Sequence, residues 1–424
     1  MRASLYSSRI GARHPKRIVE VLVTDKAMIV RIAAKGDGVS ETGAHVARAV
    51  PGDSVSVDGT VNPGPHHISP VCGHFGTCGG CQLQHGDDEV LSRFVRERVV
   101  NAATGQSLEI GELLPEHLSP PGSRRRAGLH AQKTRGGAIV GYREGGSHTL
   151  VDLVQCPVLD PKLAGLIKPL RDFVAGHGPK GNVDLALTVC DQGIDVGLSH
   201  FPLESLEATE AALEFAQCNG LARMTIDQGY GPEAIWEPEP VTITLSGLPV
   251  GLPANAFLQA TPDAEALMIA EASQWLGEAR VVADLFSGLG TFAFALAKAG
   301  KGKTKVLAAE ADQSAHLACK AAAARTGGRV ISLHRDLFRN PLQAAELDRF
   351  DAVLLDPPRA GAKSQIAQIA ESTLSRVVYI SCNPSSWARD GAVLAEAGFS
   401  LKRLRPVGQF RWSTHVELVS LFER

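Results

Sequence analysis

The 424-residue sequence has no long hydrophobic run, and stretches such as Ala352–Leu355 fall far short of the ~20 apolar residues of a membrane-spanning helix. Residues 1–16 are basic but contain no apolar core, so we expect no secretory signal. The net charge is only −2 and hydrophobic residues make up 44%, which excludes wholesale disorder, collagen and coiled coil. We therefore expect a globular cytoplasmic protein without a membrane-embedded part.

Cysteine is also scarce, with eight residues in the chain. Without a secretory signal, clustered cysteines point to metal binding or catalysis rather than to disulfide bonds. Three of them are clustered as Cys72-x5-Cys78-x2-Cys81, with glycines beside them. One C-x-x-C pair is fewer than zinc sites normally use, and adjacent glycines let backbone N–H groups approach inorganic sulfide. This favours an iron–sulfur cluster with a fourth cysteine that spacing alone does not identify, while zinc with His74 and His85 stays open.

The near-zero net charge hides two basic regions. Residues 1–35 carry eight basic and two acidic groups, and residues 122–148 carry six basic groups, Arg124–Arg126 among them, against Glu144. Basic patches on a neutral chain can bind a polyanion such as RNA through its phosphates. A solvated face balanced by nearby acids is the alternative.

The first two parts of the chain are predicted to be rich in β-structure. Short β-rich stretches at Arg17–Val23 and Ala27–Ala33, separated from later ones by Gly- and Pro-containing turns, indicate a small OB-like β-domain over 12–61. Within residues 62–250, an amphipathic helix at about Asp87–Ala103 is expected after the cysteine cluster. The stretch 123–250 then reads as mostly β-hairpins with one helix at Leu203–Cys218.

From about residue 251 the pattern changes to alternating strands and helices. Apolar strands alternate with Ala-rich helical stretches, which predicts a parallel sheet covered on both faces. The four expected strands are Val281–Phe286, Val306–Ala309, Asp351–Leu355 and Val377–Ser381. Leu401–Val407 and Val416–Phe422 are expected to close the sheet as an antiparallel pair. The fold class is therefore α/β, a Rossmann-like domain over 251–424 preceded by two β-rich domains.

A nucleotide site is indicated where Asp284-Leu-Phe-Ser-Gly288-Leu-Gly290 links an expected strand to a helix. Glycine permits a tight turn and close approach of the backbone to a ligand. Glu310 and Asp336 end the next two strands, where a carboxylate can accept hydrogen bonds from a ribose. Because the third glycine of a dinucleotide fingerprint is missing, the pattern favours S-adenosylmethionine (SAM) over NAD.

Two further motifs follow strands of the same sheet. Asp356-Pro-Pro-Arg359 resembles a motif of aminomethyltransferases, but those enzymes have an aromatic residue where this chain has Arg359. Cys382, in Ser-Cys-Asn-Pro, lies at the carboxyl end of a strand, where a thiolate could act as a nucleophile. Glu417 stands in an otherwise apolar late strand. Cysteine, carboxylate and SAM together suit methylation at C5 of a pyrimidine by addition, methyl transfer and proton removal.

Together these motifs resemble the RNA uridine-C5 methyltransferase family, in its iron–sulfur branch that modifies 23S ribosomal RNA. The resemblance implies that residues 12–61 are a TRAM domain, that Cys382 is the nucleophile and that Glu417 is the proton acceptor. It also implies SAM contacts from six residues and ligation of a 4Fe-4S cluster by four cysteines. The SAM contacts are Gln259, Phe286, Thr291, Glu310, Asp336 and Asp356, and the cluster ligands are Cys72, Cys78, Cys81 and Cys156.

The sequence thus predicts a class I SAM-dependent methyltransferase domain that forms 5-methyluridine in 23S rRNA. We expect a cytoplasmic monomer acting on a flipped-out or single-stranded uridine, with no membrane partner. Two alternatives stay open at this point: methylation of a tRNA uridine, and a catalytically inactive iron–sulfur protein that binds RNA.

Overall fold

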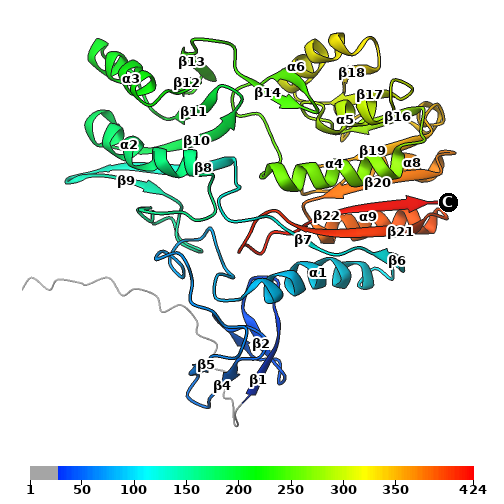
Figure 1. Ribbon diagram of the computed structural model, residues 1–424, viewed down its shortest axis with the longest axis horizontal. Coiled ribbons are helices and arrows are strands. Elements are labelled where there is room, and N and C mark those ends of the chain that lie inside the picture. The colour runs from blue at the N-terminus through cyan, green and yellow to red at the C-terminus, as the bar shows by residue number, and fades with distance from the viewer. Residues whose placement is uncertain (1–26) are drawn as a thin grey trace, which may run out of the picture.

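The structure is a computed structural model that describes residues 27–424. The first described part is a five-stranded antiparallel sheet with strand order β3-β2-β1-β4-β5 (Figure 1). Its strands are β1 (Ala27–Ile32), β2 (Gly38–Ser40), β3 (His45–Val46), β4 (Ser54–Val55) and β5 (Val61–Asn62). The strand expected at Ala27–Ala33 is confirmed, and the one expected at Arg17–Val23 lies outside the described residues.

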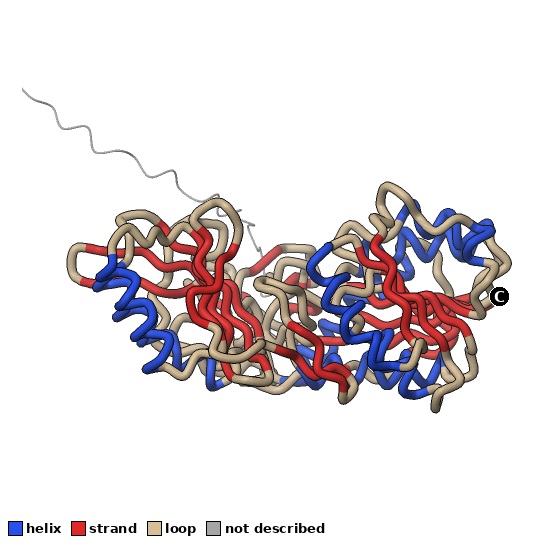
Figure 2. The backbone as a smooth tube through the Cα atoms, turned by 90° about the horizontal axis from the view of Figure 1, so that it is seen from above, coloured by secondary structure: helices blue, strands red, loops and turns tan. Residues whose placement is uncertain are grey.

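A six-stranded sheet of order β13-β12-β11-β10-β8-β9 forms the central part. Its strands are β8 (Arg126–Thr134), β9 (Gly137–Gly141), β10 (Asn182–Cys190), β11 (Gly193–Ser199), β12 (Arg223–Asp227) and β13 (Pro232–Trp236). Both expected hairpins, β8–β9 and β10–β11, are present with continuous register. The two helices α2 (Pro161–His177) and α3 (Leu206–Cys218) lie together on one side of these strands, at the left of Figure 2.

The expectation of a single helix in residues 123–250 is wrong, because α2 is a second one. Its sequence contains Pro161, Gly165 and Pro169, residues that normally weaken a helix signal. Pro161 is nevertheless tolerated in the first turn, where its missing N–H is not needed. The apolar face is regular, and burial of that face against the sheet outweighs the poor propensity. The buried residues are Leu163, Leu166, Ile167, Leu170, Phe173 and Val174.

The last part contains a nine-stranded sheet whose main path runs β18-β17-β16-β19-β20-β22-β21-β6, with β7 paired to β21. The strands are β6 (Ile110–Leu113), β7 (His117–Leu118), β16 (Val281–Leu285), β17 (Lys305–Glu310), β18 (Val330–His334), β19 (Ala352–Leu355), β20 (Arg376–Ser381), β21 (Ser400–Gly408) and β22 (Glu417–Glu423). β16 to β20 pair in parallel, and β22 pairs antiparallel with both β20 and β21. All the strands expected after residue 251 are thus confirmed.

Helices cover both faces of this sheet, as Figure 2 shows at the right of the molecule. One face carries α4 (Pro262–Leu276), α5 (Thr291–Ala299) and α6 (Gln313–Ala323), followed by a short 3-10 turn (Ala324–Thr326) and flanked by the hairpin β14 (Thr242–Leu245) and β15 (Leu248–Gly251). The other face carries α1 (Asp88–Thr104), α7 (Ala344–Leu347), α8 (Lys363–Glu371) and α9 (Pro384–Glu396). A separate hydrophobic core fills each side, which explains why the strands are apolar on both faces.

The antiparallel pair β21–β22 was expected to form the edge of the sheet. It does not, because β6 and β7 pair in parallel with β21. The helix α1 also packs on β21 and α9, alongside them in Figure 1. Residues 88–118 are therefore part of the large α/β layer although they precede the central sheet in sequence. The division into 12–61, 62–250 and 251–424 stays a prediction. Within residues 27–424, no helix is long and apolar enough to cross a bilayer.

Candidate active site and cysteine pocket

The strand order reverses at β16, which has β17 on one side and β19 on the other. In open α/β sheets, ligands bind outside the carboxyl ends of strands at such a switch point. The backbone N–H of Asp356, just after β19, donates to the carbonyl of Leu285 at the end of β16 (3.2 Å). The residues expected to bind a nucleotide and those expected to react therefore project from the same edge of one sheet.

Cys382 lies between the end of β20 and the start of α9. The neighbouring Asn383 caps α9 by accepting from the N–H of Ser385 (3.1 Å), and its Nδ2 donates to the carbonyl of Arg359 (2.9 Å). The hydroxyl of Ser386 donates to the same carbonyl (3.0 Å). These contacts tie the cysteine loop to the Asp356–Arg359 loop and so hold the expected nucleophile beside a carboxyl and a guanidinium.

The two carboxyl groups beside Cys382 have strongly perturbed protonation. Glu417 begins β22 and is only 4% exposed, so it is not the surface acid that an edge strand would present. Burial raises the pKa of Glu417 to about 7, and it raises the pKa of the half-buried Asp356 well above the usual value. Burial, with the nearby Glu417 and Asp356, raises the pKa of the Cys382 thiol to about 11, whereas Arg359 lowers it. Ser381 of β20 pairs with Leu418 of β22, so the adjoining residues Cys382 and Glu417 lie at the same edge of the sheet.

The loop from β16 to α5 has the backbone that the glycine motif predicts. Gly288 and Gly290 have φ of 53° and 90°, and a Cβ at Gly290 would lie 2.7 Å from the ring of Phe294. Phe286 also adopts φ of 63°, an uncommon conformation for an aromatic residue and one that recurs at ligand sites. Thr291 is the first residue of α5, whose N-terminal N–H groups face this loop.

The carboxylate of Glu310, at the end of β17, holds the loop between β16 and α5 in place through hydrogen bonds. One carboxylate oxygen accepts from the N–H of Gly288 (2.8 Å), and the other accepts from the N–H groups of Ala311 (2.8 Å) and Asp312 (2.7 Å). Asp284 lies inside β16, is fully buried, and neither of its carboxyl oxygens has a hydrogen-bond partner. Burial raises the pKa of Asp284 to about 7. A buried carboxyl group without a partner beside a glycine turn suits a site that is completed by a polar ligand.

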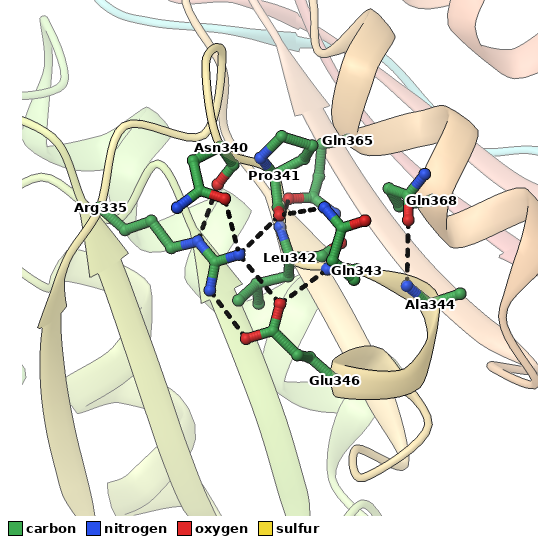
Figure 3. A network of polar contacts seen from close by, with 9 residues as sticks. All are labelled: Arg335, Asn340, Pro341, Leu342, Gln343, Ala344, Glu346, Gln365 and Gln368. Atoms are coloured by element: carbon green, nitrogen blue, oxygen red, sulfur yellow. Dashed lines mark hydrogen bonds and ion pairs between the residues drawn. The ribbon is translucent and has the colours of Figure 1, made fainter.

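Asp336 shapes the turn after β18 by accepting from the N–H groups of Phe338 (3.0 Å) and Arg339 (3.2 Å). This turn brings the ring of Phe338 to 5.3 Å from that of Phe286, across the glycine loop. The preceding Arg335 fixes the rest of the loop, as Figure 3 shows. Its guanidinium pairs with Glu346 (2.8 Å) and donates to the carbonyls of nearby loop residues. The sequence offered no signal for Arg335, because its partners lie in the irregular segment after it and in the short helix α7.

The four cysteines expected to bind a cluster line a single pocket, together with aromatic and basic side chains. Its cysteines are Cys72, Cys78, Cys81 and Cys156, and its other lining residues include Phe75, Arg124, Tyr142 and Phe410. Burial raises the pKa of the thiols of Cys78 and Cys156, and that of Cys81 to about 12. Across residues 27–424, no three His, Cys, Asp or Glu side chains are arranged to hold a single metal ion.

The two histidines of the zinc alternative lie outside that pocket. The Nε2 of His74 accepts from the N–H of Val154 (3.1 Å). His85 is buried between the rings of His67 and Phe75, each with its centroid 5.5 Å away. The pocket therefore presents four sulfur donors and no imidazole, which does not match the donor set of a Cys/His zinc site.

The three arginines of the basic motif have different roles, which the sequence did not distinguish. Arg124 lines the cysteine pocket and places its guanidinium 5.3 Å from the ring centroid of Phe410. The guanidinium of Arg126 lies in the same way over the ring of Phe257, 5.0 Å from its centroid. Arg125 is only 7% exposed and pairs with Glu265 of α4 (2.5 Å). The expectation that Arg125 contacts RNA phosphates is therefore wrong, because this side chain joins the central sheet to the α/β layer.

Comparison with known proteins agrees with this architecture. A sequence model of the tRNA (Uracil-5-)-methyltransferase family matches residues 251–424. A Zymomonas mobilis protein described as an uncharacterized RNA methyltransferase is 50% identical over 398 residues, covering 93% of this chain and 99% of the relative. The 23S rRNA (uracil(1939)-C(5))-methyltransferase RlmD of Pectobacterium atrosepticum is 31% identical, covering 85% of this chain and 81% of the relative.

A solved structure has a similar fold over nearly the whole chain. The Pyrococcus abyssi tRNA (uracil-54, C5)-methyltransferase, in complex with S-adenosyl-L-homocysteine, superimposes with a TM-score of 0.72. It is 21% identical and covers 94% of this chain and 100% of its own, so the likeness concerns the fold. Together with the full-length relatives, these matches establish that the chain belongs to the RNA uracil-C5 methyltransferase family.

Proposed function

We propose that the protein uses SAM to methylate C5 of a uridine in 23S rRNA. The observation that carries this proposal is the placement of Cys382 and Glu417 at one edge of the sheet, where Ser381 of β20 pairs with Leu418 of β22. C5 of uracil is a poor nucleophile, so the reaction needs a group that adds to C6 and a base that later removes the C5 proton. Cysteine and glutamate are the side chains that this chemistry requires.

The proposed steps use this chain's own groups as follows. The thiolate of Cys382 adds to C6 of uracil, which places electron density on C5. SAM supplies the methyl group that C5 then takes. Glu417 accepts the C5 proton, and the electron pair of that C–H bond re-forms the C5–C6 double bond as the thiolate leaves. A carboxyl whose pKa is about 7 suits a base that works near neutral pH.

The free enzyme holds its nucleophile in the protonated form. With a pKa of about 11, the Cys382 thiol is neutral at physiological pH before RNA binds. Arg359 is the neighbouring group that favours the thiolate, and its guanidinium also lies 3.4 Å from a ring nitrogen of His415. The thiol must therefore release its proton to solvent or to a neighbouring base as it adds to C6, and Arg359 favours that release.

The residues around the glycine loop fit SAM. Glu310 and Asp336 present carboxylates at strand ends, Phe286 and Phe338 offer two aromatic faces, and Asp284 supplies the unpartnered buried carboxyl. We assign the six SAM contacts given by the family resemblance to this edge of the sheet. Gln259 is included among these contacts because its Nε2 donates to Asp356 Oδ2 (3.0 Å).

We also propose that Cys72, Cys78, Cys81 and Cys156 hold a 4Fe-4S cluster. Four thiols around one pocket provide the donor set of such a cluster, and the aromatic lining shields it from solvent. When bound, the cluster would join the loop 72–81 to the segment around Cys156 and so stabilise the start of the central sheet. The chain contributes Arg124 at the rim of this pocket, close to Phe410 of the catalytic side.

Ribosomal RNA is the favoured substrate because the 31% identical RlmD relative covers most of both chains and is named for 23S rRNA. A tRNA uridine is the second candidate, since the matching family model is described as a tRNA methyltransferase family. We retain the TRAM-like segment 12–61 and the basic surface around Arg124 as the RNA-binding elements. A monomeric state and a cytoplasmic location stay predictions from the sequence.

Mapping of 5-methyluridine by mass spectrometry tests the proposal. Deproteinised 23S rRNA and bulk tRNA are each incubated with SAM and wild-type protein, Cys382→Ala or Cys218→Ala. Cys218 is exposed at the end of α3 and serves as the matched control. We expect methylated rRNA with wild type and Cys218→Ala only. Methylation confined to tRNA would move the assignment to the second candidate, and methylation by Cys382→Ala would remove the proposed nucleophile.

A further inference from the structure

The loop between β21 and β22 contains a buried glutamine that the proposed reaction does not yet use. Gln409 follows Gly408, the last residue of β21, and is only 2% exposed. Across the hairpin, Val407 of β21 pairs with Glu417 of β22, so Gln409 and Glu417 belong to the same end of the strand pair. A buried amide must place both its oxygen and its NH2 group against partners.

The contacts of Gln409 fix the orientation of two side-chain amides in sequence. Its Oε1 accepts from the backbone N–H of Ala260 (3.1 Å), and its Nε2 donates to Oε1 of Gln259 (3.2 Å). Because a backbone N–H can only donate, the oxygen of Gln409 must face Ala260 and its NH2 group must face Gln259. Gln259 must then turn its own NH2 group towards Asp356, where it donates at 3.0 Å.

The same amide lies at the strand end that carries the proposed base. A side-chain hydrogen bond from Gln409 lowers the pKa of Glu417, opposing the burial that raises it to about 7. Only the NH2 group of an amide can act on a carboxylate in this way, and one of its hydrogens already serves Gln259. Gln409 thus contacts the Gln259–Asp356 pair on the SAM side and lies at the same end of the β21–β22 pair as the carboxyl on the side of proton removal.

We propose that Gln409 is a positioning residue whose amide turns Gln259 towards Asp356 and holds the Glu417 carboxylate ready to accept the C5 proton. This inference rests on the proposed function and adds a residue to it. Gln409 touches no reacting atom itself; it acts through Gln259 and Glu417. Its removal should slow proton removal in a way that depends on pH, since Glu417 would lose the N–H that favours its charged form.

The test is the pH dependence of product release in single turnover with 23S rRNA. Gln409→Met keeps the length of the side chain but loses every polar contact. Gln409→Glu keeps an acceptor for the Ala260 N–H but cannot donate to Gln259, and it adds a negative charge beside Glu417. In both variants the pH at which the rate rises should be higher than in wild type, and this displacement should be larger in Gln409→Glu than in Gln409→Met. At high pH the rate of each variant should approach that of wild type. A profile that moves by one pH unit corresponds to a rate about tenfold lower at pH values well below the pKa of the base.

A second buried glutamine provides the matched control. Gln365 is fully buried and makes two hydrogen bonds to the backbone of Leu342, accepting at 2.9 Å and donating at 3.0 Å, in the loop drawn in Figure 3. Gln365→Met should lower the thermal stability and leave the pH profile in place. If Gln409→Met does not fold, Gln409→Glu still carries the test, because it preserves the backbone contact with Ala260.

Three results would overturn the inference: an unmoved pH profile in the folded Gln409 variants, rates reduced equally at every pH, or an equal displacement of the profile in Gln365→Met. Failure of the proposed function is recognised separately, from the wild-type protein. If wild type forms no 5-methyluridine in either rRNA or tRNA, the proposed reaction is wrong. If it forms 5-methyluridine and the Gln409 variants follow the wild-type profile, only the role of Gln409 is wrong.

Discussion

The protein holds cysteine in two contrasting settings. Cys382 lies beside two carboxyl groups and a guanidinium, and burial with those acids raises its pKa to about 11. The four clustered cysteines line a pocket that contains aromatic residues and Arg124 but no carboxylate. A single thiol among groups that can exchange protons suits a transient bond to a base, whereas four thiols in one pocket suit permanent ligation. Surroundings, not residue type, separate the two functions.

The two settings are physically close through Arg124 and Phe410. Arg124 lines the cysteine pocket and lies over the ring of Phe410, whose centroid is 5.9 Å from that of His415. His415 in turn meets Arg359 of the reactive site. Substitutions can therefore separate the two cysteine sites, or reveal that they depend on one another.

The largest expected effect is the loss of all activity in Cys382→Ala, since no electron density reaches C5 without addition at C6. Methylation and covalent RNA attachment should both vanish in a filter-binding and gel assay under denaturing conditions. Iron and sulfide content should equal those of wild type, because this thiol lies outside the cysteine pocket. Loss of iron in this variant would mean that the two cysteine sites are not independent.

Loss of the cluster should follow from Cys81→Ser or Cys156→Ser. Anaerobically purified wild type should contain about four irons and four sulfides per chain, as expected for one 4Fe-4S cluster. Each variant should lose iron and unfold at a lower temperature, because ligand binding and local folding are coupled. Cys190→Ser is the control, since this buried thiol donates to the Gly193 carbonyl elsewhere in the central sheet (3.4 Å). Stoichiometric zinc without sulfide would contradict the cluster, and equal iron in Cys190→Ser and Cys156→Ser would remove Cys156 as a ligand.

The adjacent arginines should separate stability from RNA binding. Arg125→Met leaves the Glu265 carboxylate buried without its partner, and breaking a buried pair of this kind costs about 3–5 kcal/mol. Arg124→Ala should instead weaken binding to every RNA and flatten the dependence of affinity on salt. Chemical denaturation measures the first effect, and RNA titrations at several salt concentrations measure the second. An unchanged salt slope in Arg124→Ala would assign RNA binding to other residues.

A smaller effect is expected from pH in the wild-type enzyme. Glu417 must be deprotonated to accept a proton, so product release in single turnover should rise with pH through about 7 and level off above it. Replacing Glu417 by Gln removes a neighbouring charge that raises the pKa of Cys382. The thiol of the variant should therefore react with iodoacetamide at lower pH than that of wild type. A thiol that titrates identically in both proteins would place Glu417 away from Cys382.

The sequence predicted the parts of the fold that depend on local patterns. The strands of the parallel sheet and the helix beginning after the Asp87 cap were clear because apolar periodicity and caps are local signals. The pairing of β6 with β21 could not be predicted, because it joins Leu113 and Leu404, which are far apart in the chain. α2 was missed because Pro161 and Pro169 obscured a regular apolar face.

The same distinction between local and long-range signals applies to the candidate site. Cys382 and Glu417 could be named because each belongs to a short motif whose chemistry is specific. The burial of Arg125 and the bridge from Gln409 to Gln259 could not be predicted, because each partner comes from a distant segment that only tertiary packing brings near. The charge of a residue in the sequence also failed to identify RNA-binding side chains, because Arg125 is as basic as Arg124 but faces the protein interior.

The most direct test of the central claim is the covalent species trapped by Glu417→Gln. Thiolate addition and methyl transfer should proceed, while proton removal should slow by ~10²–10⁴ as expected for loss of a general base. Mass spectrometry of the digested complex should then find a peptide with Cys382 bonded to a uridine that carries the added methyl group. Normal turnover with no trapped species, or an adduct that lacks the methyl group, would contradict the order of steps and the role of Glu417.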